Sequence, residues 1–275
     1  MRKISLNFHN KMPFQLFHVV KLLELANNEF CGTKEEISIE SGIPTGDGSG
    51  KVVGHIEFAK SMGLIDYEKE KSAYRLVLTE LGKCVYEQDP YLLEDVTKWV
   101  CNYWLTDREV GIPQWYYFMR GIPACFNQEQ ASADIEKKVQ QYFDTPVYMP
   151  VTYATYTADC FESLGLLTYT NSKANGKVVF NEVLSTMENK NVYAYTLLKS
   201  WEMQLTDYKE ITINQVLEDL KWNRAFGFSY EEILNVLDEL ASEGIITLNK
   251  QLTPMTLIRV KEADTFLPHL YDLIF

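Results

Sequence analysis

The sequence predicts a mainly α-helical fold with short β-hairpins, an α+β chain of tandem winged-helix-like units with a helical linking block. The first observation behind this prediction is that one pattern of residues ends a helix three times. The pattern occurs as AKSMGLIDY (59–67), FESLGLLTY (161–169) and LASEGIITL (240–248). The second observation is that a short β-hairpin is expected after each stretch, and the third is that a shorter helix is expected before it.

Each stretch centres on a glycine that an apolar helical stripe precedes. Residues four, seven and eleven positions before Gly63, Gly165 and Gly244 share one face of a helix. All of them are apolar: Val52, Ile56, Ala59, Ala154, Ala158, Phe161, Ile233, Leu237 and Leu240. Because glycine adopts at little cost the positive φ that ends a helix, we predict helices that stop at all three positions.

Polar turns separate two β-prone stretches after each glycine. The turns are EKEKSA, NSKANGK and NKQLTP, and the returning strands are expected over 74–78, 178–180 and 255–260. Thr33 with Glu36, and Thr212 with Gln215, have the spacing of a capping box for the shorter helices. Ser132 is the third expected N-cap. Helix, glycine and hairpin in this order indicate a winged helix-turn-helix.

These patterns divide the chain into four parts. We predict a first winged-helix-like unit over 1–88, an aromatic helical linking block over 89–128, a second unit over 129–190, and a third unit with a C-terminal docking helix over 191–275. The tryptophans of the block, Trp99, Trp104 and Trp115, are expected to pack in the core rather than to form a site.

The composition narrows the function classes. The chain has 275 residues and a net charge of −12, which disfavours a general polyanion binder because nucleic-acid affinity depends mainly on Lys and Arg. It has no apolar run of about 18 residues, the length that indicates a transmembrane helix, and no signal-peptide pattern. Its five cysteines lack zinc-site spacing. We therefore expect a cytoplasmic protein that has no cofactor, no metal and no membrane contact.

Signals for catalysis are weak. The stretch TGDGSGK (45–51) departs from the phosphate-loop pattern, which requires Gly in place of Thr45 and Ser or Thr in place of Val52. The histidines lie in no known catalytic motif: they are His9, His18, His55 and His269. His18 falls on the apolar face of the first helix, where a core position is expected. The sequence therefore predicts a protein that is not an enzyme.

Three stretches resemble an uncharacterised prokaryotic family, a domain of unknown function: GSGKVVGHIEFAKSMGLI (48–65), LTELGKCVYEQDPYLLEDVTKWVCNYWL (78–105) and QWYYFMRGIP (114–123). The resemblance implies genes placed beside those for phosphoadenosine-phosphosulfate-reductase-like proteins and DNA sulfur modification (phosphorothioation), in islands that defend against foreign DNA. It implies a fold but no reaction. The family's N-terminal His-acid-x-aromatic motif with a following Arg is incomplete, because FHNKMPFQLF has His9 and Phe14 but neither the acid nor the Arg.

The first unit carries most candidates for DNA contact. Its recognition helix and wing, together with the second wing, supply the candidate nucleic-acid-binding residues: Ser49, Lys51, His55, Lys60, Lys69, Lys71, Arg75, Lys173 and Lys177. Such residues can grip a phosphate backbone and reach a major groove. Between 45 and 80, five basic residues stand against six acidic ones, so a solvated charged surface is the alternative.

The other two units present different helix faces. The outer face of the second recognition helix is expected to carry Thr152, Thr155, Tyr156, Asp159 and Glu162. Its tyrosines are expected either to stack on bases or to fill structural positions: they are Tyr148, Tyr153 and Tyr156. The third helix carries the candidate partner-binding residues Glu231, Glu232, Asp238 and Glu239. Their carboxylates would repel phosphates, so this helix is expected to bind a protein or simply to face solvent.

Taken together, these patterns predict a non-enzymatic accessory subunit of a bacterial DNA-modification or anti-phage defence system that contacts double-stranded DNA through its first unit. The alternative is a protein-only scaffold that links a sulfur-transfer enzyme or other subunits. A single-protein transcription regulator is a weaker alternative, because such regulators are commonly dimers and more basic.

Overall fold

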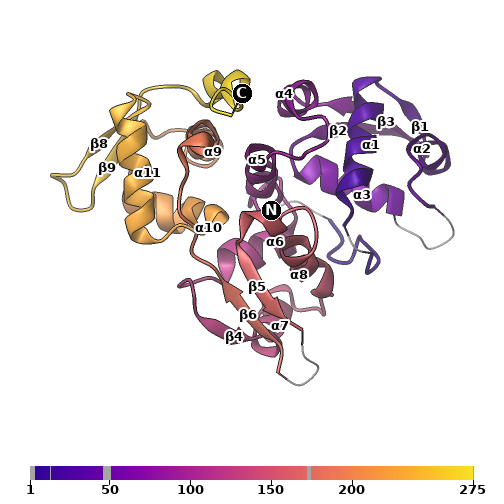
Figure 1. The fold of residues 1–275 in the computed structure, drawn as a ribbon, viewed down its shortest axis with the longest axis horizontal. Helices are drawn as coiled ribbons and strands as arrows, with labels where there is room; N and C mark the ends of the chain where they lie inside the picture. The colour runs from indigo at the N-terminus through magenta and orange to yellow at the C-terminus, as the bar shows by residue number, and fades with distance from the viewer. Residues whose placement is uncertain (1–3, 13, 46–50, 172–174, 275) are drawn as a thin grey trace.

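Three lobes surround one central helix, α5 (Asp95–Leu105), in the computed structural model (Figure 1). The structure describes residues 4–12, 14–45, 51–171 and 175–274. In this part of the chain each lobe contains one three-stranded antiparallel sheet, in which the last strand of the lobe lies between the other two. The first lobe is indigo, the second is pink and the third is orange to yellow in Figure 1.

The first lobe follows the order helix, strand, two helices and hairpin. Its elements are α1 (Leu16–Asn27), β1 (Cys31–Thr33), α2 (Lys34–Ser41), α3 (Lys51–Ser61), β2 (Ile65–Glu70) and β3 (Ala73–Leu78), and α4 (Glu80–Gln88) follows the hairpin. The Thr33 side chain accepts from the Glu36 N–H and the Glu36 carboxylate accepts from the Thr33 N–H at 2.7 Å. This reciprocal pair confirms the predicted capping box at the start of α2.

The second lobe repeats the same order with a shorter, irregular first helix. Its elements are α6 (Pro113–Tyr116), which continues as the π-helix η1 (Tyr117–Gly121), β4 (Glu129–Ala131), α7 (Ser132–Phe143), α8 (Pro150–Thr157), the 3-10 turn η2 (Glu162–Leu164), β5 (Leu167–Thr170) and β6 (Lys177–Phe180). Ser132 is the first residue of α7 rather than its N-cap, and its helix has no side-chain cap. The predicted cap at this position was therefore wrong.

The third lobe follows the 3-10 turn η3 (Met187–Asn189). Its elements are α9 (Lys190–Gln204), β7 (Glu210–Thr212), the π-helix η4 (Gln215–Asp219), α10 (Trp222–Phe226), α11 (Tyr230–Ser242), β8 (Ile246–Asn249), β9 (Thr256–Arg259) and the 3-10 helix η5 (Ala263–His269). Thr212 and Gln215 exchange the two hydrogen bonds of a capping box, at 2.9 and 3.2 Å. This second capping box is also confirmed.

The predicted α+β fold class is confirmed: the chain is mainly α-helical, with one small three-stranded antiparallel sheet in each lobe. Gly63, Gly165 and Gly244 have φ values of 75°, 65° and 66°, and a hairpin follows each of them. The sequence analysis missed the three-residue strands β1, β4 and β7, which are too short to show an alternating pattern. The boundaries of the four parts of the chain remain a prediction.

The apolar stripe in the second lobe was predicted wrongly. Helix α8 ends at Thr157, Ala158 is exposed, and the chain turns before it reaches Gly165 through η2. The buried side chains of α8 are instead Val151, Thr152, Tyr153, Thr155 and Tyr156. Tyrosine rings bury far more apolar area than alanine methyl groups, so the rings set which side of α8 faces the core.

Helix α5 joins the three lobes because all of its residues from Val96 to Leu105 except the half-buried Lys98 are buried. It contacts α3 in the first lobe, η2 in the second, and α9 and α10 in the third. The Asn102 side chain donates to the Ala225 carbonyl of α10 and accepts from the Tyr156 hydroxyl of α8, each at 2.8 Å. As predicted, Trp99, Trp104 and Trp115 belong to the core. The lobes are therefore held by one shared interior.

The segment that follows β9 closes the gap between the first and third lobes. Helix η5 packs along α9 and also contacts α4. The Cys84 thiol donates to the Leu267 carbonyl, with 3.2 Å between Sγ and O. Thr97 of α5 donates to Asp89 at 2.6 Å, so its hydroxyl accepts from the Tyr271 hydroxyl at 2.7 Å.

We predict that Gly63→Ala lowers stability more than Gly165→Ala or Gly244→Ala. All three changes place a Cβ on a left-handed backbone, which costs about 1–2 kcal/mol. A Cβ at Gly63 would also lie 3.1 Å from two atoms of the Trp104 indole, whereas nothing lies within 4 Å of a Cβ at Gly165 or Gly244. Urea unfolding of the three variants measures the difference, and equal losses would contradict it.

Candidate functional site

The first predicted recognition helix, α3, is enclosed by other parts of the chain. All of its residues are buried or half-buried. The N-terminal segment covers one side of it: the Phe8 and Phe58 rings lie 5.1 Å apart, and an added Cβ at Gly54 would lie 3.2 Å from the Met12 methyl group. On another side Trp115 packs edge-on against Phe58 at 5.4 Å. The N-terminal segment and Trp115 therefore cover two sides of α3.

His55 was predicted on the exposed face of this helix, and that prediction was wrong. The ring is fully buried beside His18. Nδ1 donates to the Lys51 carbonyl at 2.7 Å, so the neutral ring accepts at Nε2 from the Gln15 N–H at 3.2 Å and from His18 Nδ1 at 3.3 Å. Burial lowers the pKa of His55 to about 4. The neutral His55 ring therefore has a structural role: it links α3 to the start of α1 through hydrogen bonds.

His9, in the segment with the incomplete family motif, is also buried. Its ring lies edge-on to Trp115 at 6.1 Å, and Nδ1 accepts from the Lys11 N–H at 3.1 Å. Burial lowers the pKa of His9 to about 4. The segment thus seals α3 against the second lobe, where Asn7 accepts from the Tyr148 N–H. A sequence signal for this seal is the apolar spacing of Phe8, Met12 and Phe14.

The remaining candidates of the first lobe separate into two groups. Lys51 and Lys60 of α3 are half-buried, and Lys60 forms an ion pair with Asp66. Lys69, Lys71 and Arg75 lie exposed on the β2–β3 hairpin, with the Lys69 ammonium 5.0 Å from the centre of the Tyr74 ring. Ser49 and Lys173 lie outside the described residues. Among these candidates, the ones exposed to solvent therefore lie on the wing.

The second lobe exposes little of its predicted nucleic-acid surface. Thr152, Thr155 and Tyr156 were expected on an outer face, but all three are buried against the centre of the molecule. Tyr153 is also buried and stacks on Tyr169 at 4.3 Å. Lys177 is exposed and forms an ion pair with Glu129 at 2.5 Å. The tyrosines of α8 thus fill structural positions rather than a base-stacking surface.

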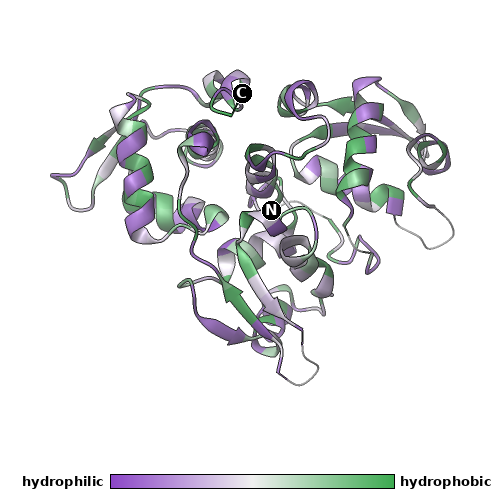
Figure 2. Ribbon diagram, viewed as in Figure 1, coloured by the Kyte–Doolittle hydropathy of each residue, from purple (hydrophilic) through white to green (hydrophobic). Residues whose placement is uncertain are grey.

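Helix α11, the predicted recognition helix of the third lobe, has one side exposed to solvent. Figure 2 shows purple and green alternating along it, as its burial pattern requires. Glu231 and Asp238 are exposed on the outer side, Glu239 is half-buried, and Asp238 is paired with Lys250 at 2.6 Å. The outer side of α11 is therefore acidic.

Glu232 was predicted on the same outer face, but it is buried. Its carboxylate accepts from the Ser185 N–H at 2.6 Å and from the Asn235 amide at 3.3 Å. Burial acts to raise the pKa of Glu232, but the hydrogen bonds from Ser185 and Asn235 outweigh it and leave the pKa below its ordinary value. Glu232 fixes the 183–190 connection to α11 rather than meeting a partner.

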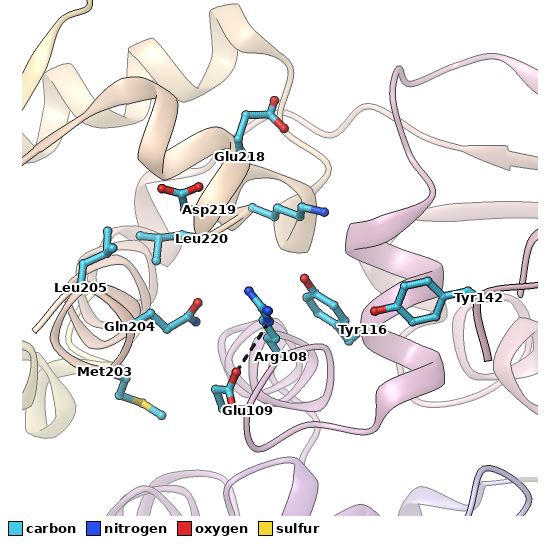
Figure 3. A pocket seen from close by; sticks show the side chains of 11 residues that line it. Arg108, Glu109, Tyr116, Tyr142, Met203, Gln204, Leu205, Glu218, Asp219 and Leu220 are labelled. Atoms are coloured by element: carbon cyan, nitrogen blue, oxygen red, sulfur yellow. Dashed lines mark ion pairs between the residues drawn. The ribbon is translucent and has the colours of Figure 1, made fainter. Parts of the chain in front are cut away.

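A polar pocket of about 640 Å³ lies where the linking block meets the second and third lobes (Figure 3). Tyr116 and Tyr142 line one side, and residues from α9 and η4 line the other. Its charged lining residues are Arg108, Glu109, Glu218, Asp219 and Lys221. With two cations against three carboxylates, the pocket has no net positive field to select a phosphate.

Among the described residues, no group of three or more His, Cys, Asp or Glu side chains could hold a metal ion. Across the same residues, no helix combines the length and the apolar character needed to cross a bilayer.

Comparison with known proteins identifies the family. The model of the family described as "Protein of unknown function (DUF4007)" matches residues 53–268, most of the chain. The chain belongs to the DUF4007 family. This confirms the predicted resemblance to a domain family of unknown function. No protein with curated annotation matches this DUF4007 chain significantly.

Two solved structures share the fold of this DUF4007 protein. They are a magnesium ion-bound crystal structure of SspB, with a TM-score of 0.77, and a second SspB crystal structure, with a TM-score of 0.74. Each match covers 98% of this chain and 89% of the other chain, at 15% sequence identity. At this identity the likeness shows a common fold.

We predict that acid destabilises the chain through its buried histidines. The pKa of His55 is about 4 in the folded state and 6.5 ordinarily, so the fold favours the neutral ring. Its stabilisation is complete above pH 6.5 and falls as the pH drops toward 4. At about 1.4 kcal/mol per pKa unit, the loss for one such ring is about 2 kcal/mol at about pH 5.

Urea unfolding at about pH 7.5 and about pH 5 measures this loss. The difference between the two pH values should be smaller in His55→Gln than in the unchanged protein. His269→Gln is the matched control, because His269 is exposed and lies outside the cluster. An equal pH dependence in His55→Gln and the unchanged protein would contradict the prediction.

Proposed function

We propose that this DUF4007 protein is a non-enzymatic accessory subunit of a bacterial DNA-modification or anti-phage defence system, and that it works by holding protein partners. The observation that carries the proposal is the burial or negative charge of the three helices that were predicted to be recognition helices, α3, α8 and α11. Helices α3 and α8 are enclosed, and α11 presents carboxylates. An enclosed helix cannot enter a groove, and an acidic one is repelled by phosphates.

Charge distribution supports a protein partner. Residues 191–275 contain seven Lys and Arg against thirteen Asp and Glu, so half of the net charge of −12 lies in the third part of the chain. Such a surface favours basic protein partners through long-range attraction. The defence setting rests on the family resemblance and agrees with the likeness to SspB. A transcription regulator is less favoured, because it would need an open recognition helix.

The scaffold proposal predicts a stable complex with protein products of the genes next to its own. Each candidate is co-expressed with the full-length chain and analysed by size-exclusion chromatography with light scattering. We expect one complex to form and to weaken in Glu231→Lys with Asp238→Lys, because the change removes exposed carboxylates from α11. Glu68→Lys in the exposed wing of the first lobe is the matched control. A chain that elutes alone with every candidate would contradict the proposal.

Direct DNA contact through the first wing is the second candidate function. It is favoured by one observation: Lys69, Lys71 and Arg75 are exposed on one hairpin. A duplex of about 30 base pairs would be titrated at about 50 mM salt, where phosphate contacts are strong. If the wing binds DNA, replacing all three residues by Glu should abolish the shift, whereas Lys137→Glu on exposed α7 should not. The absence of any shift at low salt would remove this candidate.

A further inference from the structure

Five large apolar side chains of the first lobe and of the connections beside α5 remain open to solvent. Phe17, Tyr91, Leu93, Leu184 and Met187 are each between 54% and 71% exposed. Scattered single apolar residues are ordinary on a protein surface, but contiguous ones indicate an interaction site. These five residues therefore indicate an interaction site if they are contiguous on the surface.

Three hollows in series connect them. The first, about 700 Å³, lies beside α1 and includes Phe17, Tyr91 and Leu93. The second, about 410 Å³, shares Leu93 with the first and includes Leu184 and Thr186. The third, about 220 Å³, shares Thr186 with the second, includes Met187 and ends at α11. We call these three adjacent hollows together the apolar groove.

The groove passes over all three lobes. Its first hollow lies on the first lobe, its second contains Ser163 and Leu164 of η2 together with Trp99 of α5, and its third reaches Val236 and Leu240 of α11. Because α5 fixes the lobes to one another, the groove is preformed. A preformed surface avoids much of the ordering cost that opposes binding.

The charged side chains that line the groove favour a positively charged partner. Five carboxylates line the hollows: Glu24, Glu94, Asp95, Glu188 and Glu239. The two lysines of the lining, Lys21 and Lys190, are neutralised in ion pairs with Glu24 and Glu243 at 3.1 and 2.9 Å. In the described part of the chain, Glu94, Glu188 and Glu239 have no ion pair. Apolar contacts with an acidic rim fit a basic amphipathic segment.

We infer that the apolar groove binds a segment of another protein that carries apolar side chains on one side and Lys or Arg on the other. This inference rests on the proposed scaffold function and names the partner's chemistry. A second copy of this chain is a poorer occupant, because two chains of charge −12 repel each other. Negatively charged lipid or nucleic acid would be repelled by the same rim.

A designed peptide tests the inference without knowledge of the natural partner. A fluorescein-labelled helix of about 14 residues, with Leu on one face and Lys on the other, is titrated with the full chain by fluorescence anisotropy. We expect saturable binding that weakens as salt rises. The same peptide with Glu in place of Lys should bind at least about tenfold more weakly. Absence of saturable binding, or equal affinity for both peptides, overturns the inference.

Surface variants locate the binding. Leu93→Ser with Leu184→Ser should weaken the Lys peptide at least about tenfold without unfolding the chain, because both side chains are already exposed. Leu252→Ser with Val260→Ser is the matched control, since these residues are exposed on the third hairpin. Glu94→Lys with Glu188→Lys should weaken binding and reduce its salt dependence, whereas Glu210→Lys on β7 should not. Equal effects of the groove and control variants overturn the inference.

Two further outcomes separate this inference from the proposed function. If Leu93→Ser with Leu184→Ser retains a partner complex unchanged, the apolar groove is not the docking site, although the scaffold function stands. If the unchanged chain sediments as a dimer that this variant dissociates, a second copy occupies the groove and the inference fails.

Discussion

The rest of the structure depends on the burial of most of α5, from Val96 to Leu105 with the exception of Lys98. Its large apolar side chains, including Trp99, Tyr103 and Trp104, would expose a wide apolar surface to water if other elements did not enclose them. The three lobes provide that enclosure, and Asn102 bonds to two of them at once. Each lobe alone would leave its side of α5 exposed to water. The lobes therefore form one interior, although each has its own small sheet.

The same burial extends to α3 and α8. Phe58 of α3 packs against Trp115, and the Tyr156 hydroxyl of α8 donates to Asn102 of α5. Burial of these side chains stabilises the assembly of lobes. A function depends on the residues that a fold leaves exposed, so it has to be argued from those residues and not from the fold alone.

Sequence reasoning predicted the features that local interactions determine. A glycine in a left-handed conformation, a capping box at Thr33 and a polar turn each depend on a few neighbouring residues, and all were found. Sequence reasoning failed where contacts with residues distant in the chain determine which side chains are buried. On α3, Phe58 is covered by Phe8 and Trp115, and Gly54 is covered by Met12, all from elsewhere in the chain.

The candidate site residues also separate into those that the sequence predicted correctly and those whose burial depends on distant contacts. The acidic character of α11 and the exposed wing cations could be predicted from spacing alone. The burial of His55 and Glu232 could not, because each is fixed by a bond to another segment, from Gln15 in one case and from Ser185 in the other. The apolar groove also had no sequence signal, since it joins residues of α1, the 183–190 connection and α11 that are far apart in the chain.

The contact between Tyr271 and Thr97 has a consequence for biogenesis. A ribosome releases Thr97 long before it releases Tyr271, and domains generally fold in order as they emerge. During that interval the C-terminal segment cannot yet pack between the first and third lobes. The side of α5 that Tyr271 later covers remains exposed to water. The burial of α5 is therefore completed only after the residues around Tyr271 have been synthesised.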